Sequence, residues 1–246
     1  MTEQEYFKQC YPHEGVVAII DNQWHALNNV SDTPREDFRV DGQEWLNLIV
    51  RYGEPSAVIH SHTHAEIRKD RWGHIIDPRT PSFADMQSCE VAGIPFGITH
   101  CDGNKCLDTL WIGKPSSIAL VGRPYIYGVY DCITIVRDYY FQNHGLVFDD
   151  VPREFEWSVH GDDTIMRNFL EKGFKNTFVS ISEKREFGKL NVGDILVFTI
   201  PGTKFPNHCG IYVGEGRYLH HMVGYDSTYQ NVELYAHRVT HVLRYL

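Results

Sequence analysis

Cys132 is the residue with the clearest potential for chemistry. It lies where a turn rich in glycine and proline meets the expected start of an amphipathic helix, within the segment GRPYIYGVYDCITIVRDYY. Backbone N–H groups at a helix start, together with the positive end of the helix dipole, stabilise a thiolate, which is the nucleophilic form. Packing is the competing interpretation, because cysteine is among the most buried residue types. A catalytic role therefore requires a base elsewhere in the chain.

Two histidines on a predicted β-hairpin can supply that base. The segments HCGIYV and RYLHH read as strands joined by a tight Gly-Glu-Gly turn. In this register position 208 pairs opposite about position 222, so His208 and His220 are diagonal neighbours on one face, whereas His221 faces away. Thiol peptidase chemistry needs an imidazole near the thiol and a polar group that holds the imidazole in one tautomer. A helix with a cysteine followed by antiparallel strands with histidines meets this requirement.

A second group of residues has the spacing of a metal site. His60 and His62 lie two apart in the predicted strand AVIHSH, so both imidazoles project from one face. Asp85 offers a carboxylate at a predicted helix start that Ser82 caps, and Glu14 stands at the mouth of the strand GVVAII. Two histidines and a carboxylate are a common ligand set for catalytic Zn²⁺, which lowers the pKa of bound water to about 7. Surface, capping and solvated roles are the alternatives for these residues.

The same residues resemble a known metalloprotease pattern. Their order, Glu…His-x-His…Ser-x-x-Asp, is similar to that of the JAMM (Mov34/MPN) family. The resemblance implies a zinc ion on His60, His62 and Asp85. It also implies that Glu14 is a general base and that Ser82 helps to stabilise an oxyanion.

This N-terminal sequence departs from the JAMM pattern in several places. The segment between His62 and Ser82 is longer than in the family, Thr63 replaces the usual proline, and the strand after Glu14 lacks the customary Cys-Gly. The longer segment is basic and contains two further histidines that could supply a different ligand. It could also act as a lid or docking loop. An active metalloprotease and a degenerate scaffold domain therefore both remain open.

The second half of the chain is similar to another family. The matching motifs follow one another in order: PYIYG, DC, GD, HCGIY and LH. They resemble the pattern PYxWG…DCSG…GD…HVGIY…H of the NlpC/P60 cysteine peptidases. The resemblance implies Cys132 as nucleophile, His208 as base and His220 as the group that orients it. It further implies that Tyr125 and Asp131 line the site for a free amine of the substrate. Ile-Thr follows the cysteine where the family usually has Ser-Gly.

These patterns predict an α+β protein with two domains. A JAMM-like domain with a mixed sheet and helices is expected at 1–112, and a papain-like NlpC/P60 domain at 118–246. In the second domain a helix carrying the cysteine should pack on an antiparallel sheet carrying the histidines. The domain boundary lies within 101–117, which has glycines, a proline and few periodic apolar residues, as is typical of a connector.

Composition narrows the function classes. The 246 residues include 23 basic and 32 acidic side chains, for a net charge of -9, which disfavours binding to nucleic acid or to an anionic membrane. No apolar run suits a membrane span or a signal peptide, so we expect no membrane insertion. The six cysteines follow no regular framework. Cys101 and Cys106 flank a predicted turn and are an alternative half of a metal site.

The order of the two domains is similar to that in a family of tail-tip assembly proteins of long-tailed bacteriophages. This resemblance implies a peptidoglycan endopeptidase that cuts cell-wall stem peptides, with a second zinc-dependent peptidase or isopeptidase site. Its partners would be other tail-tip proteins and peptidoglycan stem peptides. It would be present in the host cytoplasm during assembly and at the virion tail tip. The alternative is a structural tail-tip component whose hydrolase domains are inactive.

Overall fold

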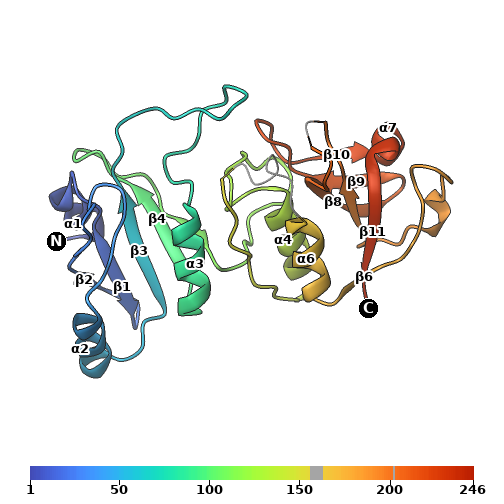
Figure 1. Cartoon of the computed structure of the whole chain (residues 1–246). Helices are drawn as coiled ribbons and strands as arrows, with labels where there is room; N and C mark the ends of the chain where they lie inside the picture. Colours follow the sequence, from blue (N-terminus) through green and yellow to red (C-terminus); the bar gives the residue numbers. More distant parts are fainter. Residues whose placement is uncertain (156–162, 202) are drawn as a thin grey trace. The chain divides into compact units, whose positions relative to one another are not determined.

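The chain folds into two compact units, each built around its own β-sheet (Figure 1). The computed structural model describes residues 1–155, 163–201 and 203–246. The N-terminal unit comprises Met1–Lys114 and the C-terminal unit comprises Pro115–Leu246. Both combine helices with sheets, which confirms the α+β class.

The N-terminal unit contains a five-stranded mixed sheet in the order β2-β1-β3-β4-β5. Strands β3 and β4 are parallel, and the other neighbours are antiparallel. The strands are β1 (Val16–Ile20), β2 (Gln23–Leu27), β3 (Ala57–His62), β4 (Phe96–His100) and β5 (Leu110–Ile112). The helices are α1 (Glu3–Cys10), α2 (Gly42–Tyr52) and α3 (Phe83–Ala92).

Helix α3 forms the crossover that parallel pairing of β3 and β4 requires. Ser82 caps this helix by accepting a hydrogen bond from the Asp85 N–H, and Gly93 ends it in the left-handed conformation. His60 and His62 lie at the end of β3, and Asp85 lies in the first turn of α3. The predicted metal ligands are therefore at the two ends of the segment that connects β3 to the crossover helix.

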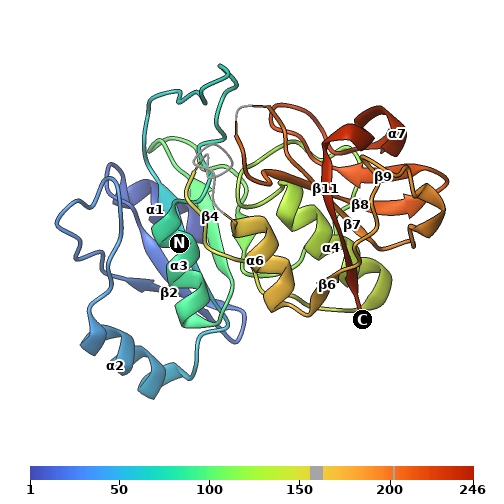
Figure 2. The same ribbon diagram turned by 45° about the vertical axis from the view of Figure 1, so that its right-hand side comes forward.

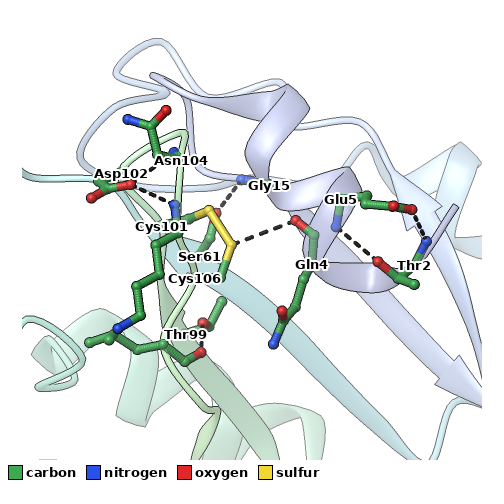
Figure 3. The surroundings of a disulfide bond; sticks show 12 residues. Thr2, Gln4, Glu5, Gly15, Ser61, Thr99, Cys101, Asp102, Asn104 and Cys106 are labelled. Atoms are coloured by element: carbon green, nitrogen blue, oxygen red, sulfur yellow. Dashed lines mark hydrogen bonds between the residues drawn. A yellow bond between two sulfur atoms is a disulfide. The ribbon is translucent and has the colours of Figure 1, made fainter.

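A disulfide closes the turn that follows β4 (Figure 3). It joins Cys101 to Cys106, both of which are buried in the cluster that contains Phe7. The Asp102 carboxylate shapes the turn by accepting hydrogen bonds from the N–H groups of Asn104 and Lys105, each at 2.8 Å. The alternative that these two cysteines form half of a metal site is therefore wrong.

The C-terminal unit contains a six-stranded antiparallel sheet in the order β10-β9-β8-β7-β11-β6. Its strands are β6 (Phe174–Asn176), β7 (Ile195–Phe198), β8 (His208–Gly214), β9 (Arg217–His220), β10 (Thr228–Asn231) and β11 (Val239–Tyr245). Its helices are α4 (Cys132–His144), α6 (Thr164–Glu171) and α7 (Val232–Tyr235), with short 3-10 turns η1 (Phe187–Lys189) and η2 (Ala236–Arg238).

Alternation along the strands gives this sheet two apolar faces. Helices α4 and α6 lie on the same side of the sheet in both views (Figures 1 and 2). Their side chains pack against Ile195, Cys209 and Leu219, while Phe198 and Tyr218 belong to the cluster on the other face. The helix that begins with the cysteine thus rests on the sheet that carries the histidines.

Candidate active sites

Cys132 is the first residue of α4, and a complete capping box surrounds it. The Asp131 carboxylate accepts hydrogen bonds from the N–H groups of Ile133 at 3.0 Å and Thr134 at 2.9 Å. The Thr134 hydroxyl in turn accepts from the Asp131 N–H at 2.8 Å. Such a reciprocal cap stabilises the first turn of a helix. Threonine, which departs from the usual glycine of the family pattern, therefore has a structural role here.

Asp131 also binds a residue for which the sequence offers no signal. Its second carboxylate oxygen accepts hydrogen bonds from the Gly128 N–H at 3.0 Å and from the Arg153 guanidinium at 2.5 and 3.2 Å. Burial raises the pKa of Asp131, but the charge of Arg153 and the hydrogen bonds to the carboxylate outweigh it, so the pKa lies below its ordinary value. Both oxygens have donors from within the chain. Binding of a substrate amine by Asp131 stays a prediction.

His208 and His220 form the hydrogen bond expected of a base and its orienting group. Nε2 of His208 lies 3.0 Å from Nδ1 of His220, and both rings are buried. Burial lowers the pKa of His208 well below its ordinary value and that of His220 to about 4, so both imidazoles are neutral and can accept a proton. The structure confirms the predicted register, because Gly210 pairs with His220.

Strand β8 begins beside the start of α4. The thiol of Cys209 donates a hydrogen bond to the carbonyl oxygen of Cys132 at 2.9 Å. His208, the residue before Cys209, is thereby held at the same end of the sheet as Cys132. Burial and the bond to Cys132 raise the pKa of Cys209 well above its ordinary value, which suppresses its own reactivity.

A third imidazole lies near this group. His221 is 1% exposed, so its imidazole is enclosed by the fold. Its ring stands edge-on to that of Tyr125 with 5.3 Å between centroids. Burial lowers the pKa of His221 to about 4, although Asp131 and the Arg123 carbonyl act in the opposite direction. No sequence pattern indicates this contact, since His221 appears there only as the second residue of a His-His pair.

In the N-terminal unit the predicted metal ligands come together. The ligand atoms of His60, His62 and Asp85 all lie within 4.8 Å of one another, and the three side chains are buried. Nε2 of His60 is 3.1 Å from one Asp85 oxygen, and Nε2 of His62 is 3.5 Å from the other. Nδ1 of His60 has no hydrogen-bond partner among the described residues. Two imidazoles converging on a buried carboxylate fit a zinc site.

The segment that is longer than in the JAMM pattern contributes to this cluster. The carbonyl oxygen of Pro78 lies 2.9 Å from Nδ1 of His62 and can only accept, so Nδ1 carries the proton and Nε2 presents a lone pair to the cluster. A second hydrogen bond of this type orients metal-binding histidines. The two further histidines of the segment, His64 and His74, are not members of the cluster, and His74 instead pairs with Asp70 at 2.9 Å.

The two remaining predicted residues, Ser82 and Glu14, lie next to this cluster. The Ser82 hydroxyl donates to Asp85 at 2.8 Å, so the structure gives it a capping and ligand-orienting position. Glu14 is buried, and burial raises its pKa to about 7; His62 lowers it, while Asp85 and Asp37 raise it further. A carboxyl group with a pKa near neutrality suits a general base. The oxyanion role of Ser82 and the base role of Glu14 stay predictions.

Comparison with known proteins identifies the class of the chain. Residues 122–244 match the NlpC/P60 family. The chain belongs to this family.

Two phage proteins are similar to the chain over different lengths. Tail tip assembly protein K of Escherichia phage N15 is 26% identical over 91% of this chain and 82% of its own length. Tail tip assembly protein K of Escherichia phage lambda is 33% identical over 42% of this chain and 47% of its own. The first similarity extends across both units.

Among solved structures, the NlpC/p60 domain of the peptidoglycan hydrolase SagA aligns with 51% of this chain and 89% of its own, at 21% identity. The TM-score of this alignment is 0.32. No helix in the described residues is both long and apolar enough to cross a membrane.

Proposed function

We propose that the chain is a cysteine peptidase that cuts the stem peptides of peptidoglycan. The observation that carries this proposal is the buried hydrogen bond between His208 and His220 at the end of the sheet where Cys132 begins α4. Family membership supports the reaction class, and similarity to tail tip assembly protein K supports a place among phage tail-tip proteins. We propose such proteins as partners, in the host cytoplasm during assembly and at the virion tail tip.

In this reaction the Cys132 sulfur attacks the amide carbonyl while His208 takes the thiol proton. His220 holds the imidazole in the required tautomer. The Asp131 carboxylate already accepts hydrogen bonds from the N–H groups of Ile133 and Thr134. The N–H of Cys132 is therefore the helix-start amide that would stabilise the oxyanion. The C–N bond then breaks, the leaving amine receives the proton from His208, and water hydrolyses the thioester.

The test is release of new amino groups from purified peptidoglycan. Wild-type protein should release them, and Cys132→Ala and His208→Ala should reduce the rate at least about 100-fold, because each removes an essential part of nucleophilic catalysis. Cys10→Ala removes a cysteine of the N-terminal unit and should leave the rate unchanged. Folded Cys132→Ala protein with wild-type activity would contradict the proposal. Inactive wild-type protein would favour the structural alternative.

We further propose that His60, His62 and Asp85 hold a zinc ion in the N-terminal unit. The convergence of their ligand atoms and the burial of all three side chains support this assignment. A bound Zn²⁺ would supply Lewis-acid chemistry there. Glu14 would hold or release a proton next to the ligands, and Ser82 and Pro78 would keep Asp85 and His62 oriented. Bound zinc in the purified chain is the quantity that tests the assignment.

A further inference from the structure

We propose that Arg153 is a positioning residue for the cysteine site and acts by balancing the charge of Asp131. The inference rests on the proposed function, since it concerns the nucleophile of that reaction. Arg153 lies between α4 and α6, is 2% exposed and belongs to none of the family motifs. Its guanidinium binds the carboxylate of the residue immediately before Cys132.

Arg153 is the last cation in a line of alternating charges that ends at Asp131. In the line, arginine and aspartate side chains follow one another, and neighbours contact through hydrogen-bonded ion pairs. The order is Arg123, Asp138, Arg137, Asp150, Arg153 and Asp131. Positive and negative groups are equal in number, so the line is neutral as a whole. Asp131 is its terminal anion, and Arg153 is the only member of the line that contacts it.

This position makes Arg153 important to the thiol. A carboxylate next to a cysteine opposes formation of the thiolate, because like charges in a partly desolvated site repel strongly. The cap provided by Asp131 nevertheless orders the helix start that carries Cys132. Arg153 resolves this conflict: it binds the oxygen that does not accept from Ile133 and Thr134, so the cap is kept while its charge is compensated.

Other titratable and charged groups also face the start of α4 and would respond in the same measurements. They come from the segment before α4, from β8 and from the end of β9. They are Tyr125, Tyr127, His208, Cys209 and His221. Burial keeps each of these groups neutral near pH 7, so the cation bound to Asp131 is Arg153.

Alkylation of Cys132 by iodoacetamide at pH 7, located by peptide mass mapping in the full chain, tests the proposal. Arg153→Met should slow the reaction about tenfold, because Asp131 is left uncompensated. Asp131→Asn keeps the cap but leaves Arg153 uncompensated, so it should speed the reaction several-fold. The double variant Asp131→Asn/Arg153→Met is neutral again and should return to within about twofold of wild type.

Controls separate charge balance from general damage. Arg167→Met removes an exposed arginine of α6 that is outside the line, and it should leave the alkylation rate near the wild-type value. Arg153→Lys keeps the positive charge and should slow alkylation of Cys132 less than Arg153→Met does. If Arg153→Met does not fold, Asp131→Asn, the double variant and Arg153→Lys provide the test. The proposal would be overturned if Arg153→Met and the double variant Asp131→Asn/Arg153→Met were slowed equally. It would also be overturned if Asp131→Asn did not speed alkylation.

The result is independent of peptide cleavage. Alkylation reports on the thiol whether or not peptidoglycan is a substrate, so failure of the proposed function leaves this test readable. Conversely, active enzyme in which these variants alkylate at the wild-type rate would reject the role of Arg153 alone.

Discussion

At the scale of single residues, the C-terminal unit buries three imidazoles in one neighbourhood. Burial lowers the pKa of His221 and of His220 to about 4, and that of His208 well below its ordinary value. Between pH 6.5 and 4 the unfolded chain therefore binds protons that the folded chain does not. These histidines therefore leave the free energy of unfolding unchanged above pH 6.5 and reduce it progressively as the pH falls below 6.5.

His221→Gln should reduce this sensitivity to acid. The fall of the His221 pKa from 6.5 to about 4 corresponds to about 2 kcal/mol of unfolding free energy lost at pH 5 relative to pH 7. The variant should lose less stability than wild type over that range, as measured by urea unfolding at both pH values. His237→Gln changes an exposed histidine of the same unit and serves as the control. Equal losses in wild type and His221→Gln would contradict the linkage.

The sequence indicated only part of this neighbourhood. Cys132, His208 and His220 stand out because motif spacing and strand alternation are local properties of the chain. Arg153 and His221 do not, because their roles depend on a loop returning to a helix start and on a side chain meeting Tyr125 across the fold. The carbonyl of Pro78 at His62 was hidden for the same reason.

At the scale of elements, the close approach of β8 and β9 brings His208 and His220 together. Gly210 lies opposite His220 in the ladder. A Cβ atom at position 210 would lie 2.7 Å from the Tyr218 ring, 2.8 Å from the Leu219 carbonyl oxygen and 3.0 Å from Cβ of His220. A side chain there would therefore push the strands apart at the histidine pair.

Gly210→Ala should destabilise the protein by about 1–3 kcal/mol, the usual cost of overpacking. It should also slow peptide cleavage, because displacement of β9 lengthens the bond between His208 and His220. Thermal unfolding and cleavage rates check both effects. Gly188→Ala, where a Cβ meets nothing within 4 Å, is the matched control. Wild-type stability and activity in Gly210→Ala would show that the strands adapt without cost.

Element types were predictable where a pattern extends over a full strand or helix. The run VVAII, the cap at Ser82 and the glycine turn of the β8–β9 hairpin all gave the observed elements. The pairing of Cys101 with Cys106 was not predicted, since cysteine spacing alone does not distinguish a disulfide from a metal half-site.

At the scale of the whole molecule, each of the two units contains one of the two proposed sites. The N-terminal unit supplies a metal-type cluster and the C-terminal unit a thiol-type cluster. Within each unit the residues of the cluster come from the same sheet and the segments attached to it. We therefore expect a substitution in one proposed site to leave the other site intact.

Purified wild-type chain should contain one zinc ion, measured by elemental analysis. Asp85→Ala and His60→Ala should lose it because each removes a ligand, and His74→Ala should keep it because His74 pairs with Asp70 instead. Chelation should leave alkylation of Cys132 unchanged. Zinc-free wild-type protein prepared without chelator, or zinc retained in Asp85→Ala, would contradict the assignment.

The line of alternating charges has a consequence for how sequences of this kind diverge. Loss of one arginine from its interior leaves a buried anion, which typically costs 3–5 kcal/mol, whereas loss of an adjacent pair can be nearly neutral. Substitutions should therefore accumulate in couples rather than singly. A relative with a neutral residue in place of Arg137 is expected to carry a neutral residue in place of Asp150 as well, and an alignment of relatives would display that co-substitution.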